Sequence, residues 1–237
     1  MNKRTFFYRL TLCPLSINTV TKRKNDIEKE NFDRKKHWEN IYQTKEQKDL
    51  SWFQPIPEIS LDFFKQFNVS KNSKVIDIGG GDSFLVDHLL DLGYQEVSVL
   101  DISEAAIDRA KLRLGKKAKN VKWIVADVAS FRPTEKYDFW HDRAAFHFLI
   151  DEQEISNYLE TAKQNINPKG VLVIRTFSEH GPKKCSGISI KQYSETTMTD
   201  RMKNFFEKTN CISIDHKTPY DTIQNFVFCS FRKIQTA

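Results

Sequence analysis

The 237-residue chain contains no apolar run that approaches the ~20 residues of a membrane-spanning helix, so we expect no membrane contact. It has only four cysteines, which stand far apart and include no C-x-x-C pair: Cys13, Cys185, Cys211 and Cys229. This spacing indicates neither a zinc site nor a framework of disulfides. Unpaired cysteines fit a reducing compartment, and we therefore expect a cytoplasmic protein.

A strong basic excess is also missing from most of the chain. The net charge is +6, but residues 1 to 50 hold 12 Lys and Arg against 7 Asp and Glu, which leaves 25 against 24 in the remainder. A broad phosphate-binding face needs a surplus of positive charge, so nucleic acid is an unlikely partner. Hydrophobic residues make up 39% of the chain, which is enough to bury a core.

The first 31 residues differ in composition from the rest. Up to Asn25 they hold six Lys and Arg and no Asp or Glu, a composition typical of a mitochondrial transit peptide. Pro14 interrupts an amphipathic helix there, so a basic disordered tail or an upstream extension of the reading frame is an equal alternative. We therefore divide the chain into a tail or targeting segment, 1–31, and one domain, 32–237. The location is cytoplasmic, or the mitochondrial matrix if the segment is a transit peptide.

The domain is organised around residues 74–85, KVIDIGGGDSFL. An apolar run of strand length is followed by three glycines, and a helical pattern then begins at Phe84. Strand, glycine turn and helix form a unit in which the backbone can approach a nucleotide closely. Phe84 replaces the third glycine of G-x-G-x-x-G, and no P-loop Gly-Lys-Ser/Thr follows. A dinucleotide oxidoreductase is therefore disfavoured.

Carboxylates stand on both sides of the glycine turn, Asp77 before it and Asp82 after it. They would repel a pyrophosphate but attract the ammonium and sulfonium groups of S-adenosylmethionine. Two more acids close apolar runs of strand length, Asp101 after 97–100 and Asp127 after 121–125. Asp101 can accept both ribose hydroxyls, and Asp127 can accept the adenine amino group. The sequence therefore predicts S-adenosylmethionine as the cofactor.

Residues 74–174 resemble the core of the class I S-adenosylmethionine-dependent methyltransferases. The motifs that carry the resemblance follow one another in order: VIDIGGG, VLDIS, ADV, YDFWHDRAAFHFL and NPKGVLVI. Ser83 departs from the family pattern, in which many members carry another glycine. The resemblance implies an α/β fold, a doubly wound, Rossmann-like sheet of seven mostly parallel strands with a terminal antiparallel hairpin. The runs 212–215 and 225–231 would supply that hairpin.

The resemblance also implies which residues bind the cofactor. A Trp-bearing helix at 33–42 and the loop 48–57 are similar to the N-terminal segment of some small members, in which Trp52 would close over the methionine end and Tyr42 could contact it. The alternative for Trp52 is packing over an edge of the sheet. The predicted cofactor-binding residues are Trp52, Asp77, Gly79, Gly81, Asp101, Ile102, Asp127, Val128 and Asp142.

Three residues at and beyond the end of the fourth strand are the predicted catalytic residues: Asp142, Arg143 and His147. A carboxylate there could orient or deprotonate a nucleophile, and Arg143 could bind an acidic substrate bidentately. Arg143 could equally form an internal ion pair with Asp142 or Asp77. His147 is a candidate general base or the site of a structural hydrogen bond. No cluster of metal ligands is evident in the sequence.

The stretch 177–193 is rich in Gly, Ser and Lys and is the predicted substrate lid, because functional loops lie at that edge of such sheets. Cys185 within it has only lysines beside it to lower the pKa of its thiol, so we interpret it as structural.

The predicted activity is transfer of a methyl group from S-adenosylmethionine, helped mainly by positioning and desolvation. The acceptor is a protein lysine or a small molecule, and the motifs leave both open. The alternative from another class is a non-catalytic, methyltransferase-like binding subunit. The acids at all three strand ends, Asp77, Asp101 and Asp127, argue against that alternative.

Overall fold

The computed structural model describes residues 32–143 and 145–234. The described residues from Lys35 onward form one compact unit, which contains the whole sheet. The predicted tail or targeting segment, 1–31, lies outside the described residues, so its role stays a prediction. Within the described ranges, no helix has the length and apolar character needed to cross a bilayer.

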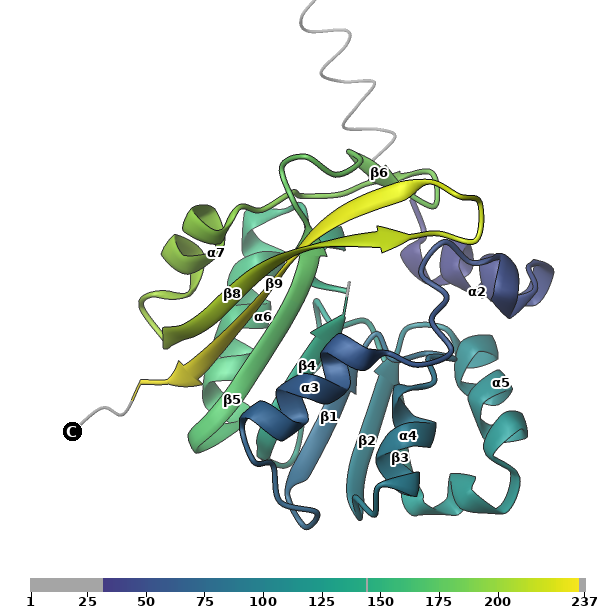
Figure 1. The fold of residues 1–237 in the computed structure, drawn as a ribbon, viewed down its shortest axis with the longest axis horizontal. Coiled ribbons are helices and arrows are strands. Elements are labelled where there is room, and N and C mark those ends of the chain that lie inside the picture. Colours follow the sequence, from purple (N-terminus) through teal and green to yellow (C-terminus); the bar gives the residue numbers. More distant parts are fainter. Residues whose placement is uncertain (1–31, 144, 235–237) are drawn as a thin grey trace, which may run out of the picture. The chain divides into compact units, whose positions relative to one another are not determined.

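Seven strands form one sheet in the order β3-β2-β1-β4-β5-β9-β8 (Figure 1). β9 runs antiparallel to β5, and the edge strand β8 runs antiparallel to β9. The other five strands are parallel. This arrangement confirms the predicted mostly parallel sheet with a terminal antiparallel hairpin. The bounds are β1 Lys74–Ile78, β2 Glu96–Asp101, β3 Val121–Val125, β4 Tyr137–Arg143, β5 Ile166–Phe177, β8 Phe206–Lys217 and β9 Ile223–Lys233.

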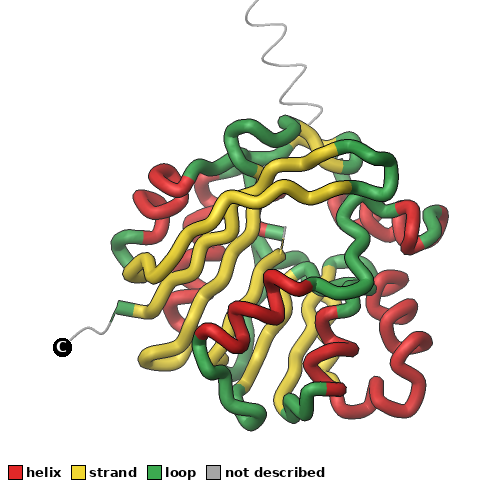
Figure 2. The backbone as a smooth tube through the Cα atoms, viewed as in Figure 1, coloured by secondary structure: helices red, strands yellow, loops and turns green. Residues whose placement is uncertain are grey.

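Helices cover both faces of the sheet, as the doubly wound prediction requires (Figure 2). α3 (Glu58–Gln66), α4 (Leu85–Asp91) and α5 (Glu104–Leu114) contribute to the core on one face. α6 (Glu152–Asn165) and α7 (Glu195–Met202) contribute to the core on the other. The remaining elements are α2 Arg34–Thr44, the 3-10 turns η1 Gln47–Asp49, η2 Gly115–Asn120 and η3 Phe146–Phe148, and the two-stranded hairpin of β6 Lys184–Cys185 and β7 Ile188–Ser189.

The alternation of side chains along β4 decides which polar residues can meet. Successive residues of a strand point to opposite faces. Phe139 packs in the α3 core and Trp140 packs in the α6 core. His141 and Arg143 therefore share the α3 face, whereas Asp142 points toward α6.

Three helices begin at residues whose side chains cap the first turn. The Ser103 hydroxyl accepts from the Ala106 N–H, and the Asp151 carboxylate accepts from the N–H groups of the first turn of α6. Ser194 forms a capping box with Thr197 at the start of α7. Each cap satisfies a backbone donor that the first turn of a helix leaves without a partner.

The two terminal strands are longer than predicted. Apolar patterning identified 212–215 and 225–231, but β8 spans 12 residues and β9 spans 11. Most side chains of β8 are at least partly exposed, because it is an edge strand. Backbone pairing extends such a strand through polar residues, and a search for apolar runs does not detect them.

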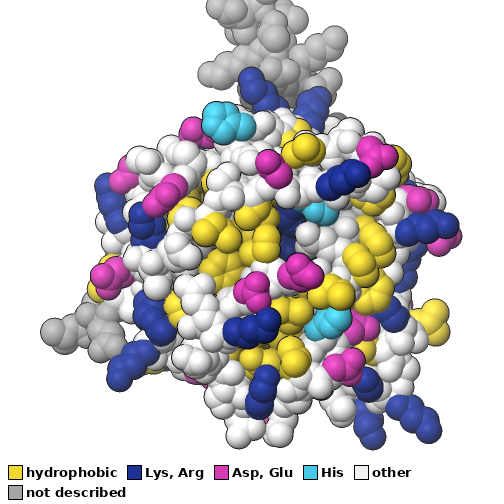
Figure 3. All heavy atoms as spheres, viewed as in Figure 1, with side chains coloured by type: hydrophobic (Ala, Val, Ile, Leu, Met, Phe, Trp, Pro, Cys, Tyr) yellow, Lys and Arg dark blue, Asp and Glu magenta, His cyan; other side chains and the backbone are white. Residues whose placement is uncertain are grey.

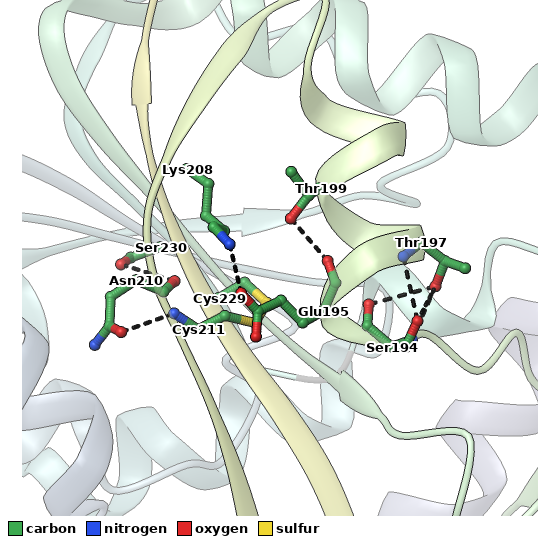
Figure 4. Close-up of a disulfide and its surroundings, with 9 residues drawn as sticks. All are labelled: Ser194, Glu195, Thr197, Thr199, Lys208, Asn210, Cys211, Cys229 and Ser230. Carbon is green, nitrogen blue, oxygen red and sulfur yellow. Dashed lines mark hydrogen bonds and ion pairs between the residues drawn. A yellow bond between two sulfur atoms is a disulfide. The ribbon is translucent and has the colours of Figure 1, made fainter.

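The cysteines require a correction, because Cys211 and Cys229 form a disulfide between β8 and β9 (Figure 4). The two residues lie directly opposite each other in the register of the hairpin. A separation of 18 residues concealed this pairing, since only the strand register brings the residues together. The prediction of unpaired cysteines was wrong for this pair, and the expectation of a reducing compartment loses its basis. Cys185 is free.

Charged side chains of both signs are interspersed on the face shown in Figure 3. Hydrophobic side chains gather near the middle of that face, among isolated Lys, Arg, Asp and Glu side chains. The even mixture corresponds to the balanced composition of the chain after residue 50.

Candidate active site

The glycine turn after β1 brings bare backbone against two carboxylates. Gly79 and Gly81 adopt positive φ values, 65° and 43°, which favour glycine. A Cβ atom at Gly80 would lie 2.7 Å from Asp77 Oδ2, and one at Gly81 would lie 2.7 Å from Asp101 Oδ2. Side chains are therefore excluded from the turn, and the carboxylates of Asp77 and Asp101 lie against it.

Asp77 is held by a buried chain of hydrogen bonds that the sequence did not reveal. Its Oδ1 lies 2.7 Å from His141 Nδ1, and His141 Nε2 lies 3.0 Å from Ser60 Oγ on α3. All three residues are at most 3% exposed. Asp77 and His141 are neighbours in the β1–β4 register, so the sheet itself positions the pair. Oδ2 of Asp77 is left facing the glycine turn.

Asp101 is a buried carboxylate at the end of β2. Its Oδ1 accepts a 2.9 Å hydrogen bond from the Ser103 N–H, and its Oδ2 faces Gly81. Burial, together with the charges of Asp82 and Asp77, raises the pKa of Asp101 to about 7. Ile102 next to it is half-buried. Three acids thus meet around the turn, an environment that favours a cationic ligand with hydroxyl groups.

Two arginines of α5 fix the far side of the turn. Arg109 Nη1 lies 3.2 Å from Asp82 Oδ2. Arg113 donates to the carbonyl oxygens of Asp82 and Ser83 at 2.8 and 2.9 Å and forms an ion pair with Asp87. Neither arginine was predicted. Their spacing on α5, one helical turn apart, puts both on one side of that helix, and this spacing was the available signal.

The predicted aromatic residues of the N-terminal segment gather in one cluster. The Trp38 and Trp52 rings lie 5.8 Å apart, and the Tyr42 and Trp52 rings lie 6.4 Å apart. Tyr42 Oη would lie 3.2 Å from a Cβ atom at Gly81, so it reaches the glycine turn. Burial, followed by the charge of Asp101, raises the pKa of Tyr42 well above its usual value. Trp52 is half-buried beside it.

Glu39 of α2 attaches this cluster to α5. Its carboxylate accepts hydrogen bonds from the Ser103 hydroxyl at 2.8 Å and from the N–H groups of Glu104 and Ala105 at 3.0 Å. An anion at a helix N-terminus is favourable, because the N–H groups there lack partners within the helix. Glu39 was not predicted, since its partners lie more than 60 residues away in the sequence.

Asp127 and Val128 follow β3, at the same edge of the sheet. Asp127 Oδ1 accepts a 2.9 Å hydrogen bond from the Ala129 N–H, and both residues are half-buried. The Ala126 N–H donates to the Asp101 carbonyl oxygen at 2.9 Å, so the ends of β2 and β3 are joined. Their predicted contact with adenine stays a prediction.

Asp142 lies on the opposite face of β4 from the cofactor half of the site. The residue is fully buried and faces α6. Its Oδ1 accepts from the N–H groups of Ala145 and Phe146 at 2.8 and 3.2 Å, and its Oδ2 accepts from Tyr158 Oη at 2.9 Å. Burial raises its pKa to about 6. These bonds engage both oxygens on the face opposite Asp77, so the geometry does not favour the predicted catalytic and cofactor-binding roles of this carboxylate, which stay predictions. Asp142 shapes the loop after β4.

Arg143 lies on the same face as Asp77 but forms neither predicted ion pair. Its guanidinium donates to Gln54 Oε1 at 2.6 Å and to Ser83 Oγ at 3.4 Å. The Gln54 amide is in turn 3.3 Å from His216 of β8. Burial lowers the pKa of Arg143, and the charges of Asp77 and Asp82 oppose that effect. The β8–β9 hairpin therefore helps to orient Arg143 through Gln54.

His147 lies in η3 with its side chain completely buried between aromatic rings. The Phe148 and Phe177 rings lie 4.4 and 5.0 Å from it. Burial, together with the charge of the neighbouring Arg175, lowers the pKa of His147 to about 3. A base of that strength is poorly matched to proton abstraction near neutral pH, so the geometry does not favour His147 as the general base. Arg175, at the end of β5, was not predicted.

The predicted lid, residues 177–193, contains the β6–β7 hairpin and is tied to the strand ends. The Lys191 N–H donates to the His147 carbonyl oxygen at 2.8 Å, and the Tyr193 N–H donates to the Phe177 carbonyl oxygen at 3.1 Å. Burial raises the pKa of Cys185 to about 11, which agrees with the interpretation of this thiol as structural. Among the described residues, no cluster of His, Cys, Asp and Glu is arranged to hold a metal.

The residues around the glycine turn fit S-adenosylmethionine. Buried carboxylates attract its cationic groups and accept its hydroxyl groups, and the turn admits a ligand only because side chains are absent from it. A family model described as a methyltransferase domain matches residues 69–224.

Curated relatives of several kinds are similar to parts of the chain. The eEF1A lysine and N-terminal methyltransferase of Mus musculus is 27% identical over 122 residues, 51% of this chain and 17% of that protein. The malonyl-(acyl-carrier protein) O-methyltransferase 1 of Ilyobacter polytropus is 30% identical over 90 residues, 38% of this chain and 33% of that protein. The chain therefore spans a third or less of the length of these two relatives.

Solved structures agree with the fold. The N-methyltransferase NodS of Bradyrhizobium japonicum WM9, in complex with S-adenosyl-L-homocysteine, matches with a TM-score of 0.62 at 14% identity, over 86% of this chain and 100% of that one. The family match covers more than half of the chain and includes the glycine turn and the ends of β1 to β5. The chain belongs to the family of methyltransferase domains, and its domain is of the class I, S-adenosylmethionine-dependent type.

Proposed function

We propose that this protein transfers the methyl group of S-adenosylmethionine to a small molecule at the carboxyl ends of β4 and β5. One observation carries the choice of a small acceptor: the polar side chains at these strand ends are enclosed. Arg175 is 1% exposed and His147 is 0% exposed. The β6–β7 segment is tied to the same place by the hydrogen bond from Lys191 to His147. A small molecule can be enclosed in this way more readily than a lysine on a folded protein.

In this proposal the cofactor is held by the half of the site around the glycine turn. Asp77 and Asp101 are the principal polar contacts, and the bare backbone of Gly79 and Gly81 allows close approach. Ile102, Asp127 and Val128 would lie on the adenine side, and Trp52 with Tyr42 at the methionine end. S-adenosylmethionine supplies the electrophilic methyl group when it is bound.

The protein itself contributes binding, orientation and the exclusion of water. Arg143 is fixed by Gln54 and Ser83 on the face that it shares with Asp77. Holding two reactants in an aligned geometry removes much of the entropic barrier to their reaction. The buried state of His147 and Arg175 indicates that water is excluded from the acceptor end.

Calorimetry and a labelling assay test this proposal. The full chain should bind S-adenosylmethionine and its demethylated product, and Asp101→Asn should bind both more weakly. Asp108→Asn is the matched control, because Asp108 is exposed on α5 and pairs only with Lys111 among the described ion pairs. With methyl-labelled cofactor and a cell extract split by size, the label should appear in the small-molecule fraction.

The outcomes separate the competing functions. Label in the protein fraction would replace the small acceptor by a protein side chain. Cofactor binding without transfer to either fraction would favour the non-catalytic subunit. Failure to bind the cofactor would overturn the proposed role of Asp77 and Asp101.

A further inference from the structure

Arg175 is a buried cation with unsatisfied hydrogen-bond donors. The residue is 1% exposed, and its Nε and Nη2 atoms have no hydrogen-bond partner within the described residues. Both ring nitrogens of the adjacent His147 are likewise buried and unpartnered. Buried polar atoms in proteins nearly always have a partner, so this group of atoms calls for an explanation.

Among the described residues, no carboxylate pairs with the Arg175 guanidinium. The guanidinium stacks on the Phe226 ring at 3.5 Å, which offsets part of the loss of solvation. Its partner in the β4–β5 register is a second cation, Arg143. Burial and the charge of Arg143 lower the pKa of Arg175 well below its usual value, although a guanidinium stays protonated in proteins.

A buried charge without a counter-ion destabilises a fold, so a purely structural reason for Arg175 is weak. An apolar side chain of similar length would fill the space against Phe226 without that penalty. A ligand with a negative charge would instead satisfy the free donors of Arg175, and the neutral His147 ring carries one further N–H donor. The predicted lid is held beside this position, because the Lys191 N–H donates to the His147 carbonyl oxygen at 2.8 Å.

We propose that Arg175 binds an anionic group, a carboxylate or a phosphate, of the methyl acceptor. This inference rests on the proposed function and names the chemical class of its substrate. A planar guanidinium binds either anion bidentately, and His147 adds a hydrogen bond from the side. The ammonium group of a lysine would be repelled by Arg143 and Arg175, which adds a reason against a lysine acceptor.

The first test is the stability of Arg175→Met in the absence of ligands. If the arginine exists to bind an anion, its removal relieves an uncompensated charge, and the variant should unfold at the same or a higher temperature than the wild type. A clearly lower unfolding temperature would show that Arg175 stabilises the fold and would overturn the proposal. Arg201→Met is the control, since Arg201 forms a partly exposed ion pair with Glu152 on the other face.

The second test measures anion binding directly, with malonate and inorganic phosphate as probes and butylammonium as a lysine mimic. Each probe is titrated into the full chain with and without S-adenosylhomocysteine. The wild type should bind malonate or phosphate but not butylammonium, and Arg175→Met should bind the anion about ten- to a hundredfold more weakly. Arg175→Lys should retain part of the affinity, because it keeps the charge but not the fork of donors. The two anion titrations distinguish a carboxylate from a phosphate.

The remaining outcomes separate failure of the anion site from failure of the proposed function. Absence of anion binding by the wild type, or preference for butylammonium, would overturn it. A loss of S-adenosylhomocysteine affinity in Arg175→Met would assign the arginine to the carboxylate of the cofactor instead. If the wild type bound malonate or phosphate but not S-adenosylhomocysteine, the proposed function would fail while the anion site stood.

Discussion

The two halves of the site differ in how their charged groups are satisfied. In the cofactor half, at the ends of β1 and β2, Asp77 is bonded to His141 and Asp82 is paired with Arg109. In the acceptor half, at the ends of β4 and β5, Arg175 and His147 keep buried nitrogen atoms without protein partners among the described residues. The cofactor half is acidic and held in place by the fold, whereas the acceptor half is cationic and incomplete.

This difference indicates which charged groups stabilise the fold and which do not. The acids of the cofactor half take part in hydrogen bonds that join strands and helices, such as the chain from Asp77 through His141 to Ser60. The cations of the acceptor half destabilise the folded chain when they stand alone, and their presence fits a functional requirement rather than a structural one.

Substitution of Gly81 should have the largest effect, because it closes the cofactor half. In Gly81→Ala the new Cβ atom would lie 2.7 Å from Asp101 Oδ2 at a φ of 43°, so both the acid and the backbone must shift. We expect binding of S-adenosylhomocysteine to fall below detection by calorimetry. Gly93→Ala is the matched control, since Gly93 also has a positive φ but no atom within 4 Å of its Cβ position. Equal losses in the two variants would show that backbone strain alone is responsible.

Asp101→Asn should weaken cofactor binding by about 1–3 kcal/mol, the range for a lost hydrogen bond to a charged group. The folded-state pKa of Asp101, about 7, lies above its ordinary value of 3.8. The folded protein therefore holds an extra proton, and the stability that this proton provides is lost as the pH rises through about 7. Ionisation should at the same time strengthen cofactor binding.

Thermal unfolding and calorimetry from pH 5 to pH 9 measure both trends. Asp101→Asn should flatten the fall in stability with pH and the rise in affinity together. A wild-type affinity for S-adenosylhomocysteine that does not change relative to the variant between pH 6 and pH 8 would contradict the assigned role of the Asp101 carboxylate.

Substitution of Asp142 tests whether its carboxylate belongs to the acceptor half of the site. If its carboxylate only shapes the loop after β4, Asp142→Asn should destabilise the fold by about 1–2 kcal/mol through the lost bond from Tyr158 and leave cofactor affinity unchanged. Tyr158→Phe removes the same hydrogen bond, and also the one that Trp140 Nε1 donates to Tyr158 Oη at 3.1 Å, so it should destabilise the fold at least as much. A hundredfold fall in turnover in Asp142→Asn, without one in Tyr158→Phe, would restore the carboxylate as a general base.

The sequence predicted the site best where its residues lie close together along the chain. The strand, the glycine turn and the acid at the next strand end lie in short stretches, so Asp77, Gly79, Gly81 and Asp101 could be placed together before the fold was known. Successive residues of a strand point to opposite faces, so Asp142 and Arg143 had to lie on different faces of β4. The sequence prediction did not use this alternation when it grouped the two residues in one site. Arg175 was missed because its surroundings come from strand register and from the lid, and the Cys211–Cys229 pair was missed for the same reason.

Glu39 of the cofactor half could not be predicted either, because its partners on α5 are distant in the sequence. Its substitution should have the smallest effect. Its carboxylate caps α5 from α2, and loss of such a cap costs about 1 kcal/mol. Glu39→Ala should lower the unfolding temperature slightly and weaken cofactor binding only a few-fold, because α5 still positions Arg109 and Arg113. Asn40→Ala, at an exposed neighbouring position on α2, should change neither quantity. Unchanged stability in Glu39→Ala would mean that α2 is held to the domain by the Trp38 and Tyr42 contacts alone.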